Sequence, residues 1–138
     1  NNDLIMVGKK ISKLLNLPLI NIVPPPKAMF KGVKRKLDVG PREFLSMIKY
    51  ADFVVTNSFH GTAFSLTYEK PFFSIYSANP DLRIQSLLKQ FNLEYRLIQA
   101  NDQFDGDVTS IDYNTMSESK VKLRESSLSY LKDALKGI

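Results

Sequence analysis

His60 is the only histidine of the chain, and it lies in the segment 57–62, Asn-Ser-Phe-His-Gly-Thr. The preceding residues 53–56 are aromatic or β-branched, which is typical of a strand buried on both faces of a parallel sheet. Residues 61–69 are then expected to form a short helix. Open parallel sheets bind ligands beyond the carboxyl ends of their strands, and helix N-termini attract anions. We therefore expect His60 in the turn at this edge, where an imidazole suits proton transfer near neutral pH.

The residues around His60 predict an anion site without a glycine-rich fingerprint. The hydroxyls of Ser58 and Thr62 and the backbone N–H groups that begin the helix at Gly61 can donate hydrogen bonds. Arg83 is expected in the first turn of the helix after the next strand, at the same edge of the sheet. Arginine favours bidentate binding of carboxylate or phosphate, although it is also common on helix surfaces. Arg42 is an alternative cation, and a histidine that only caps the turn is the alternative to a functional His60.

Several other kinds of site are disfavoured. The chain has no Gly-x-Ser-x-Gly elbow, dinucleotide fingerprint or P-loop. It contains one histidine and no cysteine, so the sequence predicts no metal site. The acidic segment 101–107 lacks the spacing and the closing glutamate of a calcium loop, and we interpret it as a solvated loop.

The hydrophobic pattern predicts alternating helices and strands. The expected elements are a helix over 3–15, a strand over 19–23, a helix from Pro41, a strand over 53–56, a helix over 61–69, a strand over 72–75, a helix over 81–91, a strand over 94–99 and a final helix from Asn114 or Ser117. Residues 24–40 are expected to be a long polar loop. This order predicts an α/β fold, with a parallel sheet and helices on both of its faces, in one Rossmann-like domain over residues 1–138.

Composition limits the class of protein. With 138 residues, 43% of them hydrophobic, the chain is long enough for one globular domain. The absence of cysteine indicates a reducing compartment, and no apolar run reaches the roughly 20 residues that cross a bilayer. The net charge is +5, with basic runs in 27–36 and 120–136 that suit solvated faces or peripheral contact with a membrane surface. Nucleic-acid binding is disfavoured, because Phe30 is the only aromatic residue in the basic loop that could stack on a base.

Three segments carry a family resemblance. They are Pro41-Arg-Glu-Phe-Leu, the run from Tyr50 through Ser-Phe-His-Gly-Thr to Glu69-Lys-Pro, and Arg83-Ile-Gln-Ser-Leu-Leu. Together they resemble the carboxyl-terminal half of the polysaccharide pyruvyl transferase family. The resemblance implies the second Rossmann-like domain of a glycosyltransferase B-type enzyme, whose active site lies in the cleft between two domains. A chain that does not begin with methionine agrees with this expectation of a missing amino-terminal domain.

The resemblance also implies an activity. Family members transfer a pyruvyl ketal from phosphoenolpyruvate to a sugar during synthesis of bacterial surface polysaccharides, either capsule or exopolysaccharide. The implied partners are phosphoenolpyruvate and a glycan or lipid-linked sugar acceptor, and no further cofactor or metal is expected. The location would be the cytoplasm, at the inner face of the membrane. By the family match, the catalytic residue would be His60, which contacts phosphoenolpyruvate or moves the proton. Ser58, Phe59, Gly61 and Thr62 beside it are expected to contact substrate, and Arg83 is our own addition.

One residue departs from the family pattern. Many members carry arginine two residues before the histidine, where this chain has Ser58, which donates a single neutral hydrogen bond. Either another cation replaces that arginine, such as Arg83 or a lysine of the segment 27–36, or the donor differs. The alternatives are a sugar-nucleotide-dependent glycosyltransferase and a non-catalytic binding module of the same fold.

Overall fold

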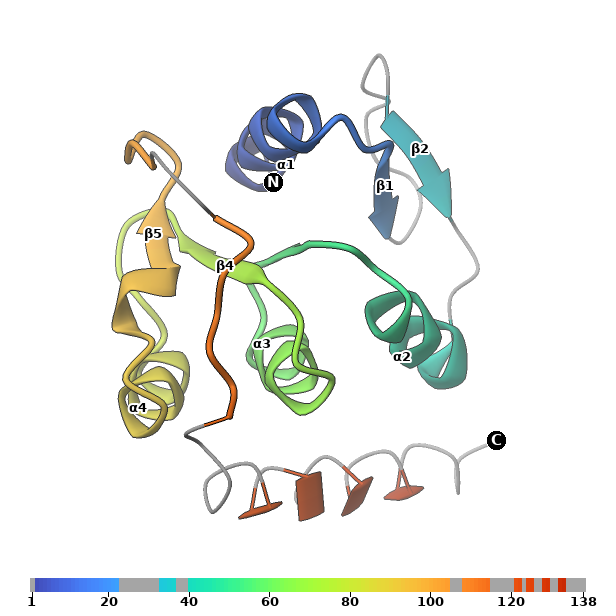
Figure 1. Cartoon of the computed structure of the whole chain (residues 1–138), viewed down its shortest axis with the longest axis vertical. Coiled ribbons are helices and arrows are strands. Elements are labelled where there is room, and N and C mark those ends of the chain that lie inside the picture. Colours follow the sequence, from blue (N-terminus) through green and yellow to red (C-terminus); the bar gives the residue numbers. More distant parts are fainter. Residues whose placement is uncertain are drawn as a thin grey trace.

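A computed structural model of the chain describes residues 2–22, 33–36, 40–104 and 108–114, together with the pairs 121–122, 124–125, 128–129 and 132–133. Its elements in chain order are α1 (Asn2–Leu15), β1 (Leu19–Ile22), β2 (Val33–Lys36), α2 (Pro41–Lys49), β3 (Val54–Thr56), α3 (Phe59–Thr67), β4 (Phe72–Tyr76), α4 (Leu82–Gln90), the 3-10 helix η1 (Glu94–Arg96) and β5 (Leu97–Gln99) (Figure 1). The fold is therefore α/β, as the sequence predicts.

All strand pairs in the described part of the chain are parallel. One sheet has the order β3-β4-β5, with Val55 opposite Phe73 and Ile75 opposite Ile98. A second, two-stranded sheet pairs β1 with β2. Parallel neighbours need a crossover connection, and α3 supplies it between β3 and β4. The carboxyl ends of β3 and β4 consequently meet at one edge.

The two faces of the β3-β4-β5 sheet bury separate hydrophobic clusters. Successive strand residues point to opposite faces, so Phe72 packs with the helix residues Leu66 and Leu88, whereas Phe73 packs with Val7 and Ile11 of α1. Figure 1 shows the same arrangement, with α3 and α4 below this sheet and α1 above it. Because β4 is buried on both faces, its near-continuous apolar sequence follows from its place at the centre of the sheet.

Most predicted elements are confirmed, and four differ in detail. The segment 24–40 contains a strand, β2, where we predicted only loop; its basic sequence has no apolar pattern that could reveal it. β1 and β3 belong to different sheets, and a cavity of about 660 Å³ is lined by residues of both strands. Residues 94–96 form η1, and only Leu97–Gln99 continue as strand. Helix α3 begins at Phe59, two residues earlier than predicted.

The end of the chain is described only in part. Residues 121–122, 124–125, 128–129 and 132–133 are helical, which agrees with the predicted final helix, and its predicted start at 114 or 117 falls largely outside the described residues. Most of the basic segment 27–36 also lies outside them. Within the described part of the chain, no helix is long and apolar enough to cross a membrane.

A buried arginine and a tyrosine attach the segment 108–114 to the sheet. Arg96 is 3% exposed and donates hydrogen bonds to the carbonyl oxygens of Phe72, Val108 and Ser110. The hydroxyl of Tyr113 donates to the carbonyl oxygen of Lys70. Burial raises the pKa of Tyr113 well above its usual range, with smaller contributions from Arg96, which lowers it, and Tyr95, which raises it.

Replacing Tyr113 by phenylalanine is expected to lower the free energy of unfolding by about 1 kcal/mol, because the Lys70 carbonyl loses its donor. The native protein holds the neutral phenol, so the stabilisation from this group is complete below its ordinary pKa of about 10 and declines as the pH rises above it. Urea unfolding at a series of pH values tests both effects. If the difference in free energy of unfolding between wild type and Tyr113→Phe stays constant above pH 10, the predicted pH dependence is wrong.

Candidate functional site

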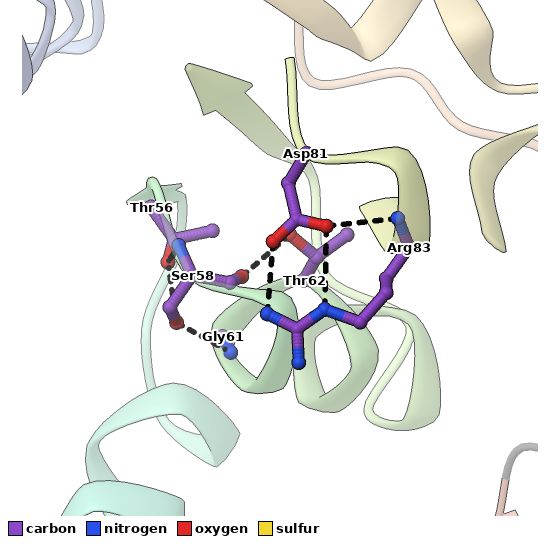
Figure 2. A network of polar contacts seen from close by, with 6 residues as sticks. All are labelled: Thr56, Ser58, Gly61, Thr62, Asp81 and Arg83. Carbon is purple, nitrogen blue, oxygen red and sulfur yellow. Dashed lines mark hydrogen bonds and ion pairs between the residues drawn. The ribbon is translucent and has the colours of Figure 1, made fainter. Parts of the chain in front are cut away.

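The site is built at the junction of β3 and α3, where a short polar turn ends the strand and begins the helix. Ser58 is the N-cap of α3, and its side-chain oxygen accepts a hydrogen bond of 2.9 Å from the Gly61 N–H. The Ser58 N–H donates to Oγ1 of Thr56, at the end of β3. Figure 2 shows these contacts linking the last strand residue to the first turn of the helix. Ser58 therefore fixes the direction in which α3 leaves the sheet.

Gly61 is required by the closeness of this turn to the strand. A Cβ built on Gly61 would lie 2.2 Å from Oγ1 of Thr56 and 2.9 Å from the Ser58 hydroxyl oxygen. No side chain fits at either distance. The glycine therefore allows the first turn of α3 to pack directly against the end of β3, which brings the helix N-terminus to the edge of the sheet.

Thr62 holds the turn from inside the protein. Its side chain is 0% exposed, donates to the Ser58 carbonyl oxygen at 2.9 Å and lies 2.6 Å from the Ser74 hydroxyl on β4. This pair explains why two small polar residues occur in an apolar helix and an apolar strand. The geometry gives Thr62 a positioning role, since its hydroxyl does not reach the surface in this conformation.

His60 lies in the first turn of α3 rather than in the turn before it, because the Ser58 cap starts the helix early. Its ring is half-buried between two aromatic rings, with centroids 5.5 Å from Phe59 and 6.4 Å from Phe64. Burial lowers the pKa of His60, and the positive charge of Arg83 lowers it further. The imidazole is therefore mainly neutral at pH 7, and its contribution to stability is lost as the pH falls from about 6.5 through the folded-state value.

Arg83 stands at the same edge as His60. It is in the first turn of α4, and its guanidinium lies 5.2 Å from the centroid of the Phe59 ring, which also packs edge-on with the His60 ring. Asp81 caps α4 through the Arg83 N–H and pairs with the guanidinium at 2.9 and 3.3 Å (Figure 2). The pair lowers the pKa of Asp81 and raises that of Arg83.

This arrangement can accept a small anion. A guanidinium has five N–H donors, and Asp81 takes two of those of Arg83, so the described contacts leave three for a ligand. Arg83 is 67% exposed, which keeps those donors accessible. The nine-residue helix α3 directs its positive end to the same edge, beside a neutral imidazole that can accept a proton.

The structure divides the six predicted site residues into two neighbouring groups. His60, Phe59 and Arg83 form one cluster, whereas Ser58, Gly61 and Thr62 form the turn behind it. Arg42 lies in the first turn of α2, on a different helix from His60 and from Arg83. Sequence reasoning missed Asp81 as the partner of Arg83. An aspartate two residues before an arginine at a helix start is the signal that could have revealed it.

Among the described residues, no group of three or more histidine, cysteine or acidic side chains could hold a metal ion.

The effect of Arg83 on the histidine can be measured directly. In the variant Arg83→Gln the pKa of His60 should rise, because a nearby positive charge is removed, but it should stay below 6.5, because burial is the larger cause. NMR titration resolves this cleanly, since the chain has a single imidazole. The matched control is Arg42→Gln, which removes the same charge elsewhere. An equal rise of the His60 pKa in Arg83→Gln and Arg42→Gln would contradict the proximity of Arg83 and His60.

Two cavities border this edge. The larger, of about 660 Å³, lies between β1, α2 and β3 and reaches Ser58 and Gly61. The smaller, of about 180 Å³, lies beyond the ends of β3 and β4 and includes Asn57, Ser77 and Asp81 in its lining. The turn that carries His60 therefore separates a mainly apolar hollow from a polar one.

These features define the class of the protein as a Rossmann-like α/β domain with a candidate anion site at the carboxyl ends of its strands. The family model of the polysaccharide pyruvyl transferases matches residues 5–79, more than half of the chain, and the chain belongs to this family. The match includes the turn with His60 but ends before Arg83. No curated protein and no solved structure matches the chain significantly.

Proposed function

We propose that this chain is the donor-binding domain of a pyruvyl transferase that forms a ketal on a sugar with phosphoenolpyruvate as donor. Membership of the transferase family supports the reaction class, and the cluster of His60, Phe59 and Arg83 supports the donor. The observation that carries the proposal is the pairing of a depressed-pKa imidazole with an exposed guanidinium at the end of a parallel strand. The resemblance of the sequence to the carboxyl-terminal half of the family further supports a second, amino-terminal domain in the complete protein.

The reaction needs two proton movements. The methylene carbon of phosphoenolpyruvate takes one proton and becomes a methyl group, and two hydroxyls of the sugar bond to the central carbon as phosphate leaves. The two hydroxyl protons balance the step, one ending on the methyl carbon and one on the departing phosphate. Because the pKa of His60 is lowered, the neutral imidazole is suited to accept the proton of an attacking hydroxyl.

Arg83 would bind the carboxylate or the phosphate of the donor. In this role it replaces the arginine that many relatives carry at the position of Ser58, and Ser58 instead caps α3. Asp81 holds the guanidinium in a fixed direction, which lowers the entropy lost when an anion binds. The positive end of α3 adds to the attraction for the donor. The Phe59 ring lies near both the Arg83 guanidinium and the His60 ring.

The favoured test compares ligands on the full-length protein. Phosphoenolpyruvate is expected to raise the melting temperature, since a ligand that binds only the folded state stabilises it, and Arg83→Gln should reduce the rise. UDP and GDP are the matched ligands for the sugar-nucleotide alternative. Stabilisation by a nucleotide and not by phosphoenolpyruvate would favour the glycosyltransferase, and no stabilisation by any of them would favour a binding module.

A further inference from the structure

The smaller cavity has a chemistry of its own. The cavity has a volume of about 180 Å³, and its polar lining consists of Asp3, Asn57, Tyr76, Ser77, Asn79 and Asp81. Asn57 directly follows β3 and Ser77 directly follows β4, whereas Asp3 comes from the first turn of α1. Three separate segments thus contribute polar groups at the edge of the sheet where this fold binds ligands.

The lining disfavours an anion. It contains two carboxylates and no lysine, arginine or histidine, so phosphoenolpyruvate would be repelled from it. It also disfavours a metal ion, since the described residues offer no group of three acidic or histidine side chains. The Ser77 hydroxyl donates to Asp3 at 2.7 Å, and Arg83 compensates the charge of Asp81. Both carboxylates are therefore held in place with oxygen lone pairs still able to accept hydrogen bonds.

A neutral ligand with several hydroxyls fits these groups. Its hydroxyls can donate to the carboxylate and amide oxygens and accept from the side-chain amides of Asn57 and Asn79. Three apolar residues, Ile75, Ile84 and Leu97, complete the lining and can face the carbon atoms of a sugar ring. An elongated anion finds no lysine, arginine or histidine in this lining.

We infer that this polar cavity binds one monosaccharide unit of the acceptor. The inference rests on the proposed function, because the acceptor must lie beside the donor. Asn57 is three residues before His60, and Asp81 is bonded to Arg83, whose guanidinium lies over the Phe59 ring. Asp81 therefore belongs both to the lining of the cavity and to the ion pair with Arg83, which Figure 2 shows. A sugar held there would lie against Asp81 and therefore close to the Arg83 guanidinium that Asp81 binds.

Two variants and one matched control test the inference on the full-length protein. Asn57→Leu and Asn79→Leu remove cavity amides from exposed positions, and Asn101→Leu makes the same change at an exposed position outside the cavity. The probes are methyl α-D-glucopyranoside, methyl α-D-mannopyranoside and methyl β-D-galactopyranoside, titrated by saturation-transfer NMR with phosphoenolpyruvate present and absent. At least one glycoside should bind to wild type, about tenfold more weakly to each cavity variant, and within twofold of wild type to the control.

The outcomes separate this inference from the donor proposal. Glycoside binding that depends on Asn57 and Asn79 supports the inference even when phosphoenolpyruvate does not bind. If phosphoenolpyruvate binds but no glycoside does, or if the cavity variants bind as wild type does, the inference is overturned. Displacement of the glycoside by calcium chloride, with loss of calcium binding in Asn79→Leu, would also overturn it in favour of a cation.

Discussion

Replacing His60 by glutamine is expected to lower the turnover of the full-length protein by about 10²- to 10⁴-fold, the usual effect of losing a general acid–base group. Glutamine keeps a side chain of similar length that can form hydrogen bonds, but it cannot exchange a proton near neutral pH. The ring is half-buried among Phe59 and Phe64, so the substitution should cost little stability. The assay measures the release of phosphate from phosphoenolpyruvate in the presence of a sugar acceptor.

The pH profile gives the control for this variant. In wild type the turnover should fall as the pH drops below the lowered pKa of His60, because protonation removes the base, whereas this limb should be missing from His60→Gln. The melting temperatures of the two proteins should agree within a few degrees. Undiminished turnover in a folded His60→Gln variant would remove His60 from the reaction.

The substitution Gly61→Ala is expected to destabilise the protein by roughly 1–3 kcal/mol, the range for overpacked positions. The added methyl carbon would lie 2.2 Å from Oγ1 of Thr56, within a turn that Ser58 and Thr62 also hold. Either α3 moves away from β3 or the Ser58 cap breaks, and both changes displace the His60 backbone. Urea unfolding gives the loss of stability, and the His60 imidazole signal reports the displacement.

Gly40→Ala is the matched control. Gly40 is the N-cap of α2, and a methyl group there would meet Oε2 of Glu43, the end of a flexible side chain, at 2.8 Å. That side chain can rotate away at small cost, so the control should lose much less stability than Gly61→Ala. Equal losses in the two variants would show that the close packing of α3 on β3 is not the cause.

The central part of the fold could be predicted from the sequence because its pattern is unambiguous. The apolar run at 72–75 predicts a strand buried on both faces, and β4 separates the two hydrophobic clusters. Asp81 predicts the start of α4, and it caps that helix through the Arg83 N–H. In both cases local sequence and tertiary packing favour the same structure.

Other features depend on contacts between distant residues and leave weak local signals. β2 has a basic sequence, and its strand form follows from pairing with β1 rather than from its own pattern. The position of His60 inside α3 depends on Ser58, which was interpreted as a ligand donor rather than as a cap. The burial of Thr62 needs Ser74 as its partner, twelve residues away, and neither residue indicates the other in sequence.

The proposed pyruvyl transfer from phosphoenolpyruvate is assigned to the edge of the sheet that holds both His60 and Arg83. The most direct measurement incubates the full-length protein with phosphoenolpyruvate and a glycan acceptor in D₂O and follows the product by NMR and mass spectrometry. We expect a ketal whose methyl group carries one deuterium, formed together with an equal amount of phosphate, and a strong loss of both in His60→Gln. Intact phosphoenolpyruvate beside an acceptor that is instead glycosylated from an added sugar nucleotide would contradict the account.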